Sequence, residues 1–364
     1  MKFPYFKKQL SLIPYGEKLS IGATPDFALE VTDPSGLVYE ILCNCNGSNT
    51  IEDIYIKIKH KYKDLRIEEV TEIIDSLSSY PLILEDYATT IESSLTPREI
   101  ERHSRTMNFL SNFDYLGTEK VNYMKKIINS NVLIIGLGGV GSSLAMNLAA
   151  LGVQRLYGVD FDKVDLSNLN RQLLYSESDV GSLKSEAAKE KLDKFDSSIQ
   201  FTTFQLEITC TEDVERLIKE FNIDFVFCAA DQPSIWIYKW INEACHNTQT
   251  AWIYGGNSEA SSYFQTIIPN ETSCFNCREL NLKQFSAEGY FKYSEVKKHG
   301  YATQNNCLAA TSSCITSFMI FDFIRYITKF ESPRVVNQLF TLDYRDYTIS
   351  YLPVEKNQMC NCQE

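Results

Sequence analysis

Residues 136–141 read GLGGVG, a glycine-rich loop between a short apolar run and a run of helix-forming residues. Glycines in such a loop let backbone N–H groups approach phosphate oxygens at the positive end of a helix. The glycines expected to act here are Gly136, Gly138, Gly139 and Gly141. Asp160 follows about 20 residues later, where an acidic side chain can accept hydrogen bonds from both ribose hydroxyls. The pattern predicts a nucleotide site and fits NAD and ATP equally well.

A polar set downstream of the loop favours ATP. A dehydrogenase needs a hydride pocket and a proton donor, often His, and none of the four His residues has a recognisable catalytic setting. Cations and amides instead lie where triphosphate oxygens would bind, and they can stabilise the charge on departing pyrophosphate. These residues are Asn168, Arg171, Gln172 and Lys184. Asp231 follows an apolar run at the edge of the sheet where ligands bind, and a lone carboxylate there is a natural Mg²⁺ ligand.

Two close pairs of cysteines lie in the second half of the chain. Cys274 and Cys277 form a C-x-x-C pair, and Cys360 and Cys362 form a C-x-C pair. Four thiolates can close a tetrahedral Zn²⁺ shell with no open position, so these residues predict a structural zinc site. Most of the other seven cysteines lie in apolar helices or strands, where a buried free thiol is the expected state.

An α/β framework from residue 131 onward must position these residues. Apolar strand-like runs alternate with helical patterns, which predicts a parallel sheet covered on both faces. The expected strands are 132–136, 155–160, 200–207, 225–230 and 250–256. The expected helices are 139–151, 184–195, 211–221 and 235–245. A long polar segment over 278–304, one apolar helix to about residue 329 and two closing strands complete the prediction.

The first 88 residues indicate a small separate module. Short strand-like stretches between residues 10 and 32 precede three predicted helices, a pattern typical of a winged-helix-like α+β fold. Residues 89–130 are expected to form a linker with one helix over REIERHSRTMNFL. The predicted divisions are therefore 1–88, 89–130 and 131–364.

Composition limits the partners. The 364 residues, 44% of them hydrophobic, suffice for about two domains with their own cores. A formal net charge of −12 argues against sequence-independent binding to nucleic acid or to an anionic membrane. Glycines in the uncharged run 132–153 favour a buried strand and helix over a membrane span, and no secretory signal is recognised, so a cytoplasmic location is expected.

Residues 99–364 resemble the ThiF/MoeB superfamily, relatives of the ubiquitin-activating enzymes, which adenylate a carboxylate with ATP. The resemblance implies a Rossmann-like adenylation domain with a mixed sheet, and ATP and Mg²⁺ as cofactors. It assigns the ribose contact to Asp160 and Mg²⁺ to Asp231. It assigns phosphate contacts to Asn168, Arg171 and Lys184, and Gln172 also follows the family pattern. The shorter second cysteine pair departs from the family, which has two C-x-x-C pairs.

The same resemblance implies a homodimer. In the family, the arginine of an R-x-x-R element reaches the ATP of the neighbouring subunit, and RHSR places that arginine at Arg105, with Arg102 as the other candidate. Some family members also transfer the activated carboxylate to a cysteine near Cys307. Cys307 opens the predicted apolar helix, and a position in the core is favoured for it over such a transfer.

The N-terminal module resembles the precursor-recognition domains of ribosomal-peptide maturation systems. Their pattern is an apolar helix, a Cys-x-Gly-type turn and a Thr-initiated helix, matched here by Ile41, Leu42, Cys45, Gly47 and Thr50. A plain three-helix cap is the alternative. With this module, the chain looks like the peptide-modifying branch of the superfamily, which matures microcin C and pantocin A.

This branch implies that a carboxylate of a precursor peptide, bound through the N-terminal module, is adenylated with ATP. Pantocin-type cyclisation or microcin-type nucleotidylation would follow, and the former is favoured. Activation of a ubiquitin-like sulfur carrier and non-catalytic leader docking are the alternatives. The residues expected on the acceptor side are Tyr254, Asn257, Tyr290, Tyr293 and a loop over 278–304.

Overall fold

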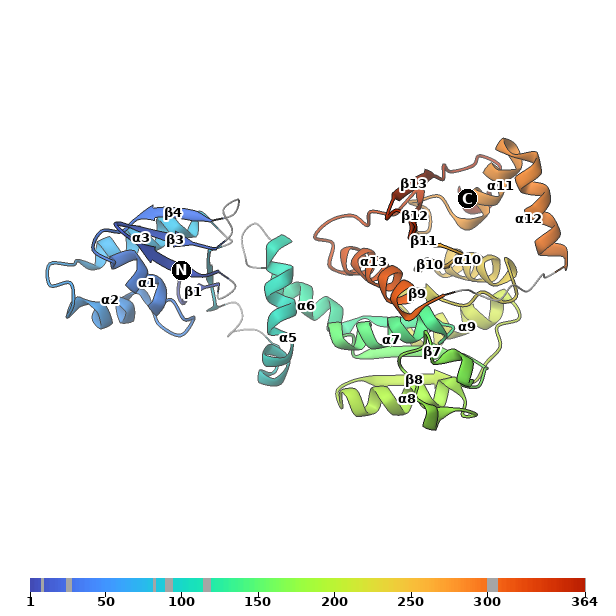
Figure 1. The fold of residues 1–364 in the computed structure, drawn as a ribbon, viewed down its shortest axis with the longest axis horizontal. Coiled ribbons are helices and arrows are strands. Elements are labelled where there is room, and N and C mark those ends of the chain that lie inside the picture. Colours follow the sequence, from blue (N-terminus) through green and yellow to red (C-terminus); the bar gives the residue numbers. More distant parts are fainter. Residues whose placement is uncertain are drawn as a thin grey trace. The chain divides into compact units, whose positions relative to one another are not determined.

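The structure is a computed structural model that describes residues 1–7, 10–23, 28–80, 83–88, 94–113, 119–299 and 307–363. The chain divides into two compact units, residues 1–125 and 126–364. Each unit is described by itself, and Figure 1 gives the element labels. The predicted three-part division at residues 88 and 130 stays a prediction.

The first unit combines small sheets with helices, so the expected α+β character is confirmed. Its three-stranded antiparallel sheet has the order β2–β3–β4, and β1 pairs with β5 in a second sheet. The strands are β1 (Pro4–Phe6), β2 (Leu12–Tyr15), β3 (Lys18–Ile21), β4 (Leu29–Thr32) and β5 (Leu84–Asp86). The helices are α1 (Leu37–Asn44), α2 (Ile51–Lys59) and α3 (Ile67–Ser78). They enclose an apolar core that includes Leu19, Ile41, Ile54 and Ile74.

Thr50 begins α2 as predicted. Its side chain accepts a hydrogen bond from the backbone N–H of Asp53, and the Asp53 carboxylate accepts one from the Thr50 N–H. This reciprocal capping box satisfies two N–H groups that the helix itself leaves unpaired. Gly47, with a φ of +80°, supplies the left-handed turn before the cap.

Two further helices follow in sequence. Helix α5 (Pro97–Leu110) begins at a Thr96 cap, buries His103, Met107 and Leu110, and leaves Arg105 exposed. A short 3₁₀ turn, Ser111–Phe113, ends it, and α6 (Lys120–Asn129) leads to the second unit. Helix α6 was not expected, because its lysines and asparagines obscure the apolar face.

The second unit contains an eight-stranded mixed sheet with the order β13–β12–β11–β10–β9–β6–β7–β8. Strands β8, β7, β6, β9 and β10 run parallel, and the remaining pairs are antiparallel. The first strands are β6 (Asn131–Ile135), β7 (Arg155–Val159), β8 (Gln200–Phe204) and β9 (Phe225–Cys228). The others are β10 (Ala251–Asn257), β11 (Ser261–Ile267), β12 (Gln338–Asp343) and β13 (Ile349–Pro353). This arrangement confirms the predicted α/β fold with a mixed sheet.

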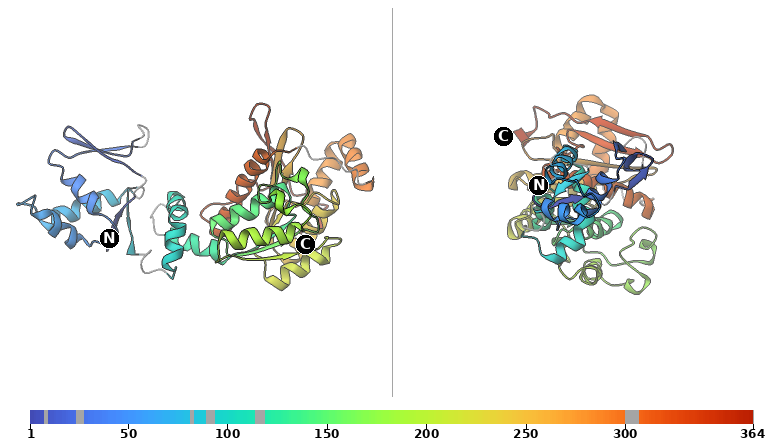
Figure 2. Two further views of the ribbon diagram at one scale, coloured as in Figure 1. Left: turned by 60° about the horizontal axis from the view of Figure 1, so that its bottom comes forward. Right: turned by 90° about the vertical axis from the view of Figure 1, so that its left-hand side faces the viewer.

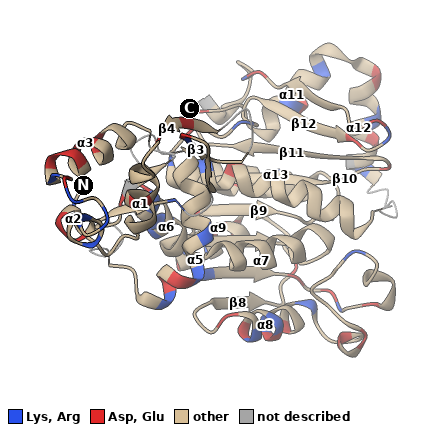
Figure 3. Ribbon diagram, turned by 60° about the vertical axis from the view of Figure 1, so that its left-hand side comes forward, with Lys and Arg blue, Asp and Glu red and all other residues tan. Residues whose placement is uncertain are grey.

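Helices cover both faces of that sheet. Helices α7 (Gly139–Leu151), α8 (Lys184–Phe195) and α13 (Ala309–Thr328) pack on one face, as Figures 1 and 2 show. Helices α9 (Thr211–Phe221) and α10 (Trp236–Thr248) pack on the other. The central strands β9, β10 and β11 carry no charged residue and appear tan in Figure 3. Because helices cover both faces of the sheet, these central strands are buried on both sides, and such strands are apolar.

One sequence expectation about this unit was wrong. Residues 278–299 do not form a loop, because α11 (Phe275–Phe285) and α12 (Ala287–His299) occupy them, and α11 packs against α10. Residues 300–304 of the expected segment lie outside the described residues. Across the described part of the chain, no helix combines the length and hydropathy needed to cross a bilayer.

Candidate active site

A cavity of about 350 Å³ opens at the carboxyl ends of the parallel strands. The chain leaves β6 toward β7 on one side, whereas β9 lies on the other side of β6. Ligands of open α/β sheets bind at such a switch in strand order. The volume lies in the range of small-molecule sites.

The glycine loop forms one wall. Gly136 has a φ of +90°, and an added Cβ would lie 2.8 Å from the backbone N of Ala230. Only glycine fits this crossing without strain. Gly138 precedes α7. The first N–H groups of a helix have no partner within it, and no side chain caps those of α7. Together with the positive end of the helix dipole, these groups form a binding site for an anion such as phosphate.

Asp160 connects the glycine loop to β7. Its Oδ2 accepts a hydrogen bond from the Leu137 N–H at 2.7 Å, and its Oδ1 accepts one from the Asp162 N–H at 2.8 Å. Burial raises the pKa of Asp160 above its ordinary value, and the nearby Lys184 ammonium opposes that shift. Each carboxylate oxygen still has a free lone pair for a ribose hydroxyl.

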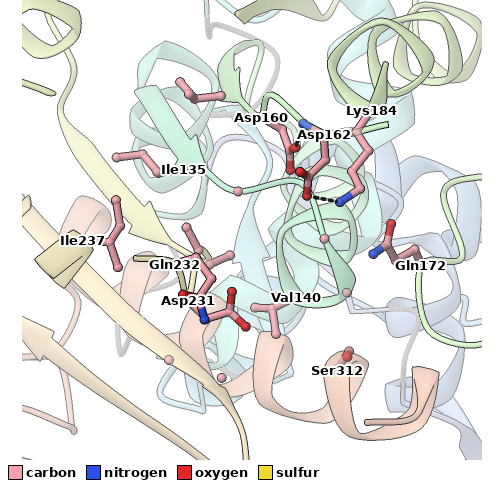
Figure 4. A pocket seen from close by; sticks show the side chains of 18 of the residues that line it. Ile135, Val140, Asp160, Asp162, Gln172, Lys184, Asp231, Gln232, Ile237 and Ser312 are labelled. Carbon is pink, nitrogen blue, oxygen red and sulfur yellow. Dashed lines mark hydrogen bonds and ion pairs between the residues drawn. The ribbon is translucent and has the colours of Figure 1, made fainter. Parts of the chain in front are cut away.

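Lys184 begins α8 and places its ammonium group at the cavity. The Nζ atom lies 2.8 Å from Oδ2 of Asp162, and Figure 4 shows this pair beside Asp160. The Lys184 backbone N–H also donates to the Asp162 carbonyl at 2.9 Å. Asp162 therefore holds both ends of Lys184.

Arg171 and Gln172 approach from the segment between β7 and α8. The Nη1 of Arg171 donates to the Ser167 carbonyl at 3.1 Å and to Oδ1 of Asn170 at 3.0 Å. Gln172 is 2% exposed, and its Oε1 atom is buried without a hydrogen-bond partner among the described residues. An unsatisfied buried acceptor in a cavity wall calls for a donor from a ligand or water.

Asp231 lies across the cavity from Lys184. It follows β9, is exposed, and lies near Gln232 and Ile237 in Figure 4. Both Asp231 and the glycine loop line the cavity, so a bound triphosphate and a cation held by this carboxylate would be in reach of each other.

Most predicted site residues meet in this cavity. Those that line it are Gly136, Gly138, Gly139, Asp160, Arg171, Gln172, Lys184 and Asp231. Gly141 and Asn168 are not among the lining residues. Gly141 allows close packing, since an added Cβ would lie 1.7 Å from the Gly136 carbonyl oxygen. Asn168 shapes the loop instead, because its Oδ1 accepts from the Asp165 N–H at 3.2 Å.

Arg105 belongs to the first unit, so its predicted contact with ATP stays a prediction. The structure places it on the exposed side of α5, as it does Arg102. The core position favoured for Cys307 was wrong: this half-buried residue lines the cavity, because α13 begins only at Ala309.

Sequence reasoning missed Asp162 and Ser312 in the cavity wall. The carboxylate at position 162, two residues after Asp160, was the available signal. Ser312 has no such signal, since it is one of several small polar residues in an apolar helix. The Ser312 Oγ accepts a hydrogen bond from Nδ2 of Asn257 at 3.1 Å. Asn257, one of the residues expected on the acceptor side, also lines the cavity.

The paired cysteines meet at a separate place. Their four Sγ atoms lie within 4.8 Å of one another, and all four residues are buried. Cys274 and Cys277 come from the start of α11, whereas Cys360 and Cys362 follow β13. The Sγ atoms of Cys277 and Cys362 are 3.4 Å apart, and those of Cys274 and Cys360 are 3.5 Å apart. A tetrahedral Zn²⁺ shell places sulfurs about 3.8 Å apart, so the cluster fits this ion.

The ThiF family profile matches residues 103–363, which is more than half of the chain. The chain belongs to the ThiF family. Relatives of this ThiF-family chain include heterocyst HesA of Trichormus variabilis, 27% identical over 267 residues, which covers 73% of this chain and 90% of HesA. Ubiquitin-like modifier-activating enzyme 5 of Dictyostelium discoideum is 28% identical over 221 residues, 58% of this chain and 56% of that relative. The chain spans about half the length of the relatives of this second kind.

Solved structures resemble the ThiF-family chain over its whole length. The crystal structure of E. coli MccB with ATP gives a TM-score of 0.71 at 20% identity and covers 99% of both chains. The structure of PaaA gives a TM-score of 0.71 at 21% identity, over 96% of this chain and 100% of PaaA. These likenesses confirm the expected fold, including the module before the adenylation domain.

Proposed function

We propose that this ThiF-family chain uses ATP to adenylate a carboxylate of a peptide. The observation that carries the proposal is the convergence of the uncapped α7 N-terminus, Arg171, Lys184 and Asp231 on one cavity. Family membership assigns the same class of activity, ATP-dependent adenylation.

In the proposed step, a carboxylate oxygen attacks the α-phosphorus atom, and the bond from that phosphorus to the bridging oxygen of pyrophosphate breaks. The products are an acyl adenylate and pyrophosphate. Lys184 and Arg171 stabilise the charge that develops on the departing oxygens, and the N–H groups at the start of α7 orient the phosphates. The attacking carboxylate is already ionised at neutral pH, so no general base is needed.

The proposal includes two metal ions. Asp231 would hold Mg²⁺, which offsets the triphosphate charge when bound. Cys274, Cys277, Cys360 and Cys362 would hold one Zn²⁺ with no open position, which makes its role structural. Such an ion joins the start of α11 to the chain after β13, two segments about 80 residues apart in sequence.

A peptide is the proposed substrate. Structures of E. coli MccB, described as a microcin C7 biosynthetic enzyme, include its complex with MccA. The first unit of this chain has the short strands and the Thr50-capped helix α2 expected of a precursor-recognition domain. Within the described residues, β2 and β4 are the edge strands of its three-stranded sheet, where a peptide can add as a further strand. Binding the leader there raises the effective concentration of the reactive carboxylate at the ATP site. The chain is proposed to act as a homodimer, with Arg105 completing the partner's site.

The test is mass spectrometry of candidate precursor peptides incubated with the protein, ATP and Mg²⁺. Loss of water from the peptide indicates cyclisation, and retained AMP indicates nucleotidylation. Modification should cease in Asp231→Asn and persist in Asp193→Asn, a matched change on the exposed side of α8. Peptide that binds wild type but stays unmodified would favour leader docking without catalysis, and modification that survives Asp231→Asn would contradict the role of Asp231.

Activation of a ubiquitin-like protein is the second candidate, because several relatives are ubiquitin-like modifier-activating enzymes. The two candidates differ in what the first unit must bind. Adenylation of a ubiquitin-like protein, with no peptide modified, would decide for the second candidate. An NAD-dependent reaction is disfavoured, because no His residue is among the described residues that line the cavity.

A further inference from the structure

A second cavity, of about 340 Å³, adjoins the nucleotide cavity. Tyr238 and Tyr263 line both cavities, so the two meet at these rings. Apolar side chains, including Ile235, Phe275 and Leu339, form much of the remaining wall. A peptide group bound here would lie beside the site where ATP activates a carboxylate.

Arg278 brings a positive charge into this apolar setting. It lies in the first turn of α11 and lines the second cavity. Its Nη1 donates a hydrogen bond to Oη of Tyr254 at 3.1 Å, and Tyr254 in turn donates to Oε1 of Gln265 at 2.8 Å. Tyr254 and Gln265 are both fully buried. The guanidinium is therefore anchored to a buried hydrogen-bond network.

In the described part of the chain, this charge has no carboxylate partner. Within the described residues, Arg278 forms no ion pair, and the side chains that act on it electrostatically are the phenols of Tyr254, Tyr263 and Tyr293. The carboxylate of the adjacent Glu279 also lines this cavity, but it pairs with Lys239. A guanidinium has five N–H donors, and among the described residues only its Nη1 group donates a hydrogen bond.

Tyr293 supplies an independent observation. Its ring, from α12, lines the same cavity, and its hydroxyl is buried with no hydrogen-bond partner among the described residues. Buried polar groups are rarely left unsatisfied, so this hydroxyl, near a guanidinium that has no ion pair among the described residues, indicates a site for a ligand. Both groups can donate hydrogen bonds, so the ligand should be an acceptor and an anion.

We propose that Arg278 and Tyr293 bind a carboxylate of the acceptor peptide, separate from the carboxylate that ATP activates. This inference rests on the proposed function and adds a specificity-determining subsite to it. A planar carboxylate matches the guanidinium fork in two parallel hydrogen bonds, which a neutral amide cannot match. The carboxylate can come from the peptide's C-terminus or from an Asp or Glu side chain close to the activated group.

The test uses four synthetic peptides based on acetyl-Gly-Gly-Gly-Glu. One keeps both carboxylates, two have either the α-carboxylate or the side-chain carboxylate replaced by an amide, and one has neither. Binding to the full chain is measured by calorimetry in the presence of Mg²⁺ and a non-hydrolysable ATP analogue. Wild type should prefer the dicarboxylate to the double amide by about tenfold or more, as expected for a charge-assisted pair.

Arg278→Gln should remove that preference, and Tyr293→Phe should reduce it several-fold while leaving the buried Tyr254 network intact. Lys283→Gln is the control, because this exposed residue of α11 does not line the cavity. One of the two single-amide peptides should bind wild type and Arg278→Gln equally well. The carboxylate that this peptide lacks is the one that Arg278 binds. An unchanged preference in both cavity variants, or no preference in wild type, would overturn the inference. Failure of the proposed function would appear separately, as absent ATP–pyrophosphate exchange in wild type with Arg278-dependent peptide binding preserved.

Discussion

The ammonium group of Lys184 and the Oδ2 atom of Asp162 lie 2.8 Å apart, although the lysine side chain is 8% exposed and the carboxylate 51% exposed. The pair therefore has a buried cationic end and a solvated anionic end. A phosphate that enters the cavity can replace Asp162 as the partner of Lys184, and the released carboxylate remains in water. Exchanging one anionic partner for another costs less than stripping water from a solvated lysine.

Lys184→Ala should lower ATP–pyrophosphate exchange about 100-fold, the loss typical for removal of one donor that stabilises developing negative charge. The measurement is the exchange rate at saturating ATP and peptide. Lys189→Ala, on the exposed surface of the same helix and paired with Asp193, should leave the rate unchanged. Equal losses in the two variants would indicate damage to α8 and would contradict the assigned role.

Asp162→Asn should affect the reaction less than Lys184→Ala does. It tests whether Asp162 only positions the Lys184 ammonium group or contributes its own charge to the reaction. The Asn keeps the backbone carbonyl that accepts from Lys184, yet it removes the carboxylate that holds Nζ. We expect a weaker affinity for ATP and a nearly unchanged rate at saturation, because the phosphates still find the lysine. A large loss of rate at saturating ATP would show that the carboxylate itself acts in the reaction.

Burial raises the pKa of Asp160, and this predicts the pH dependence of ribose binding. The carboxylate form accepts hydrogen bonds from the hydroxyls, so affinity is present above the pKa and is lost as the pH falls through it. Since that pKa is raised, the loss begins at a higher pH than for an exposed Asp. Calorimetry with adenosine, which has no titrating phosphate, measures the profile. Asp160→Asn should bind weakly with a flat profile, and a pH-independent wild type would contradict the assignment.

Local signals made much of the second unit predictable. GLGGVG fixes the end of β6 and the start of α7, since only glycine tolerates the crossing at Gly136. Helix α9 has its predicted bounds because its apolar face is regular and Asn222 ends it in a left-handed conformation. Helices α11 and α12 escaped prediction because apolar residues such as Phe285 and Phe291 are exposed, 76% and 63%, and follow no single face.

The missed parts of the site depend on contacts between distant segments. The hydrogen bond of Arg278 to Tyr254 joins α11 to β10, and no local pattern announces it. In the sequence, Asp162 is one charged residue shortly after a strand. Its pairing with Lys184 is visible only in the folded structure. Sequence therefore predicts residues that act through local backbone geometry better than it predicts pairs formed by tertiary packing.

One zinc ion per chain should be found by elemental analysis, and the content should fall sharply in the double variant Cys360→Ser, Cys362→Ser. Burial raises the pKa of Cys362 to about 12, so in the absence of a cation this thiol stays protonated at neutral pH. A bound divalent cation reverses that preference by stabilising the thiolates. The double variant should also melt at a lower temperature. Full zinc content in the double variant would show that the ligands lie elsewhere. Cys210→Ser, Cys314→Ser is the matched control and should keep its zinc.

Mixing two inactive variants tests the homodimer and the role of Arg105. If each site combines Lys184 of one subunit with Arg105 of the other, Arg105→Ala and Lys184→Ala should each be inactive as homodimers. In a mixed dimer, one site retains both residues and the other lacks both. With random exchange of subunits, half of the dimers are mixed, so about a quarter of the wild-type ATP–pyrophosphate exchange should return. A mixture of Arg102→Ala with Lys184→Ala tests in the same way whether Arg102 is the arginine supplied by the other subunit. No recovery with either mixture, despite subunit exchange verified by native mass spectrometry, would contradict an arginine supplied across the dimer.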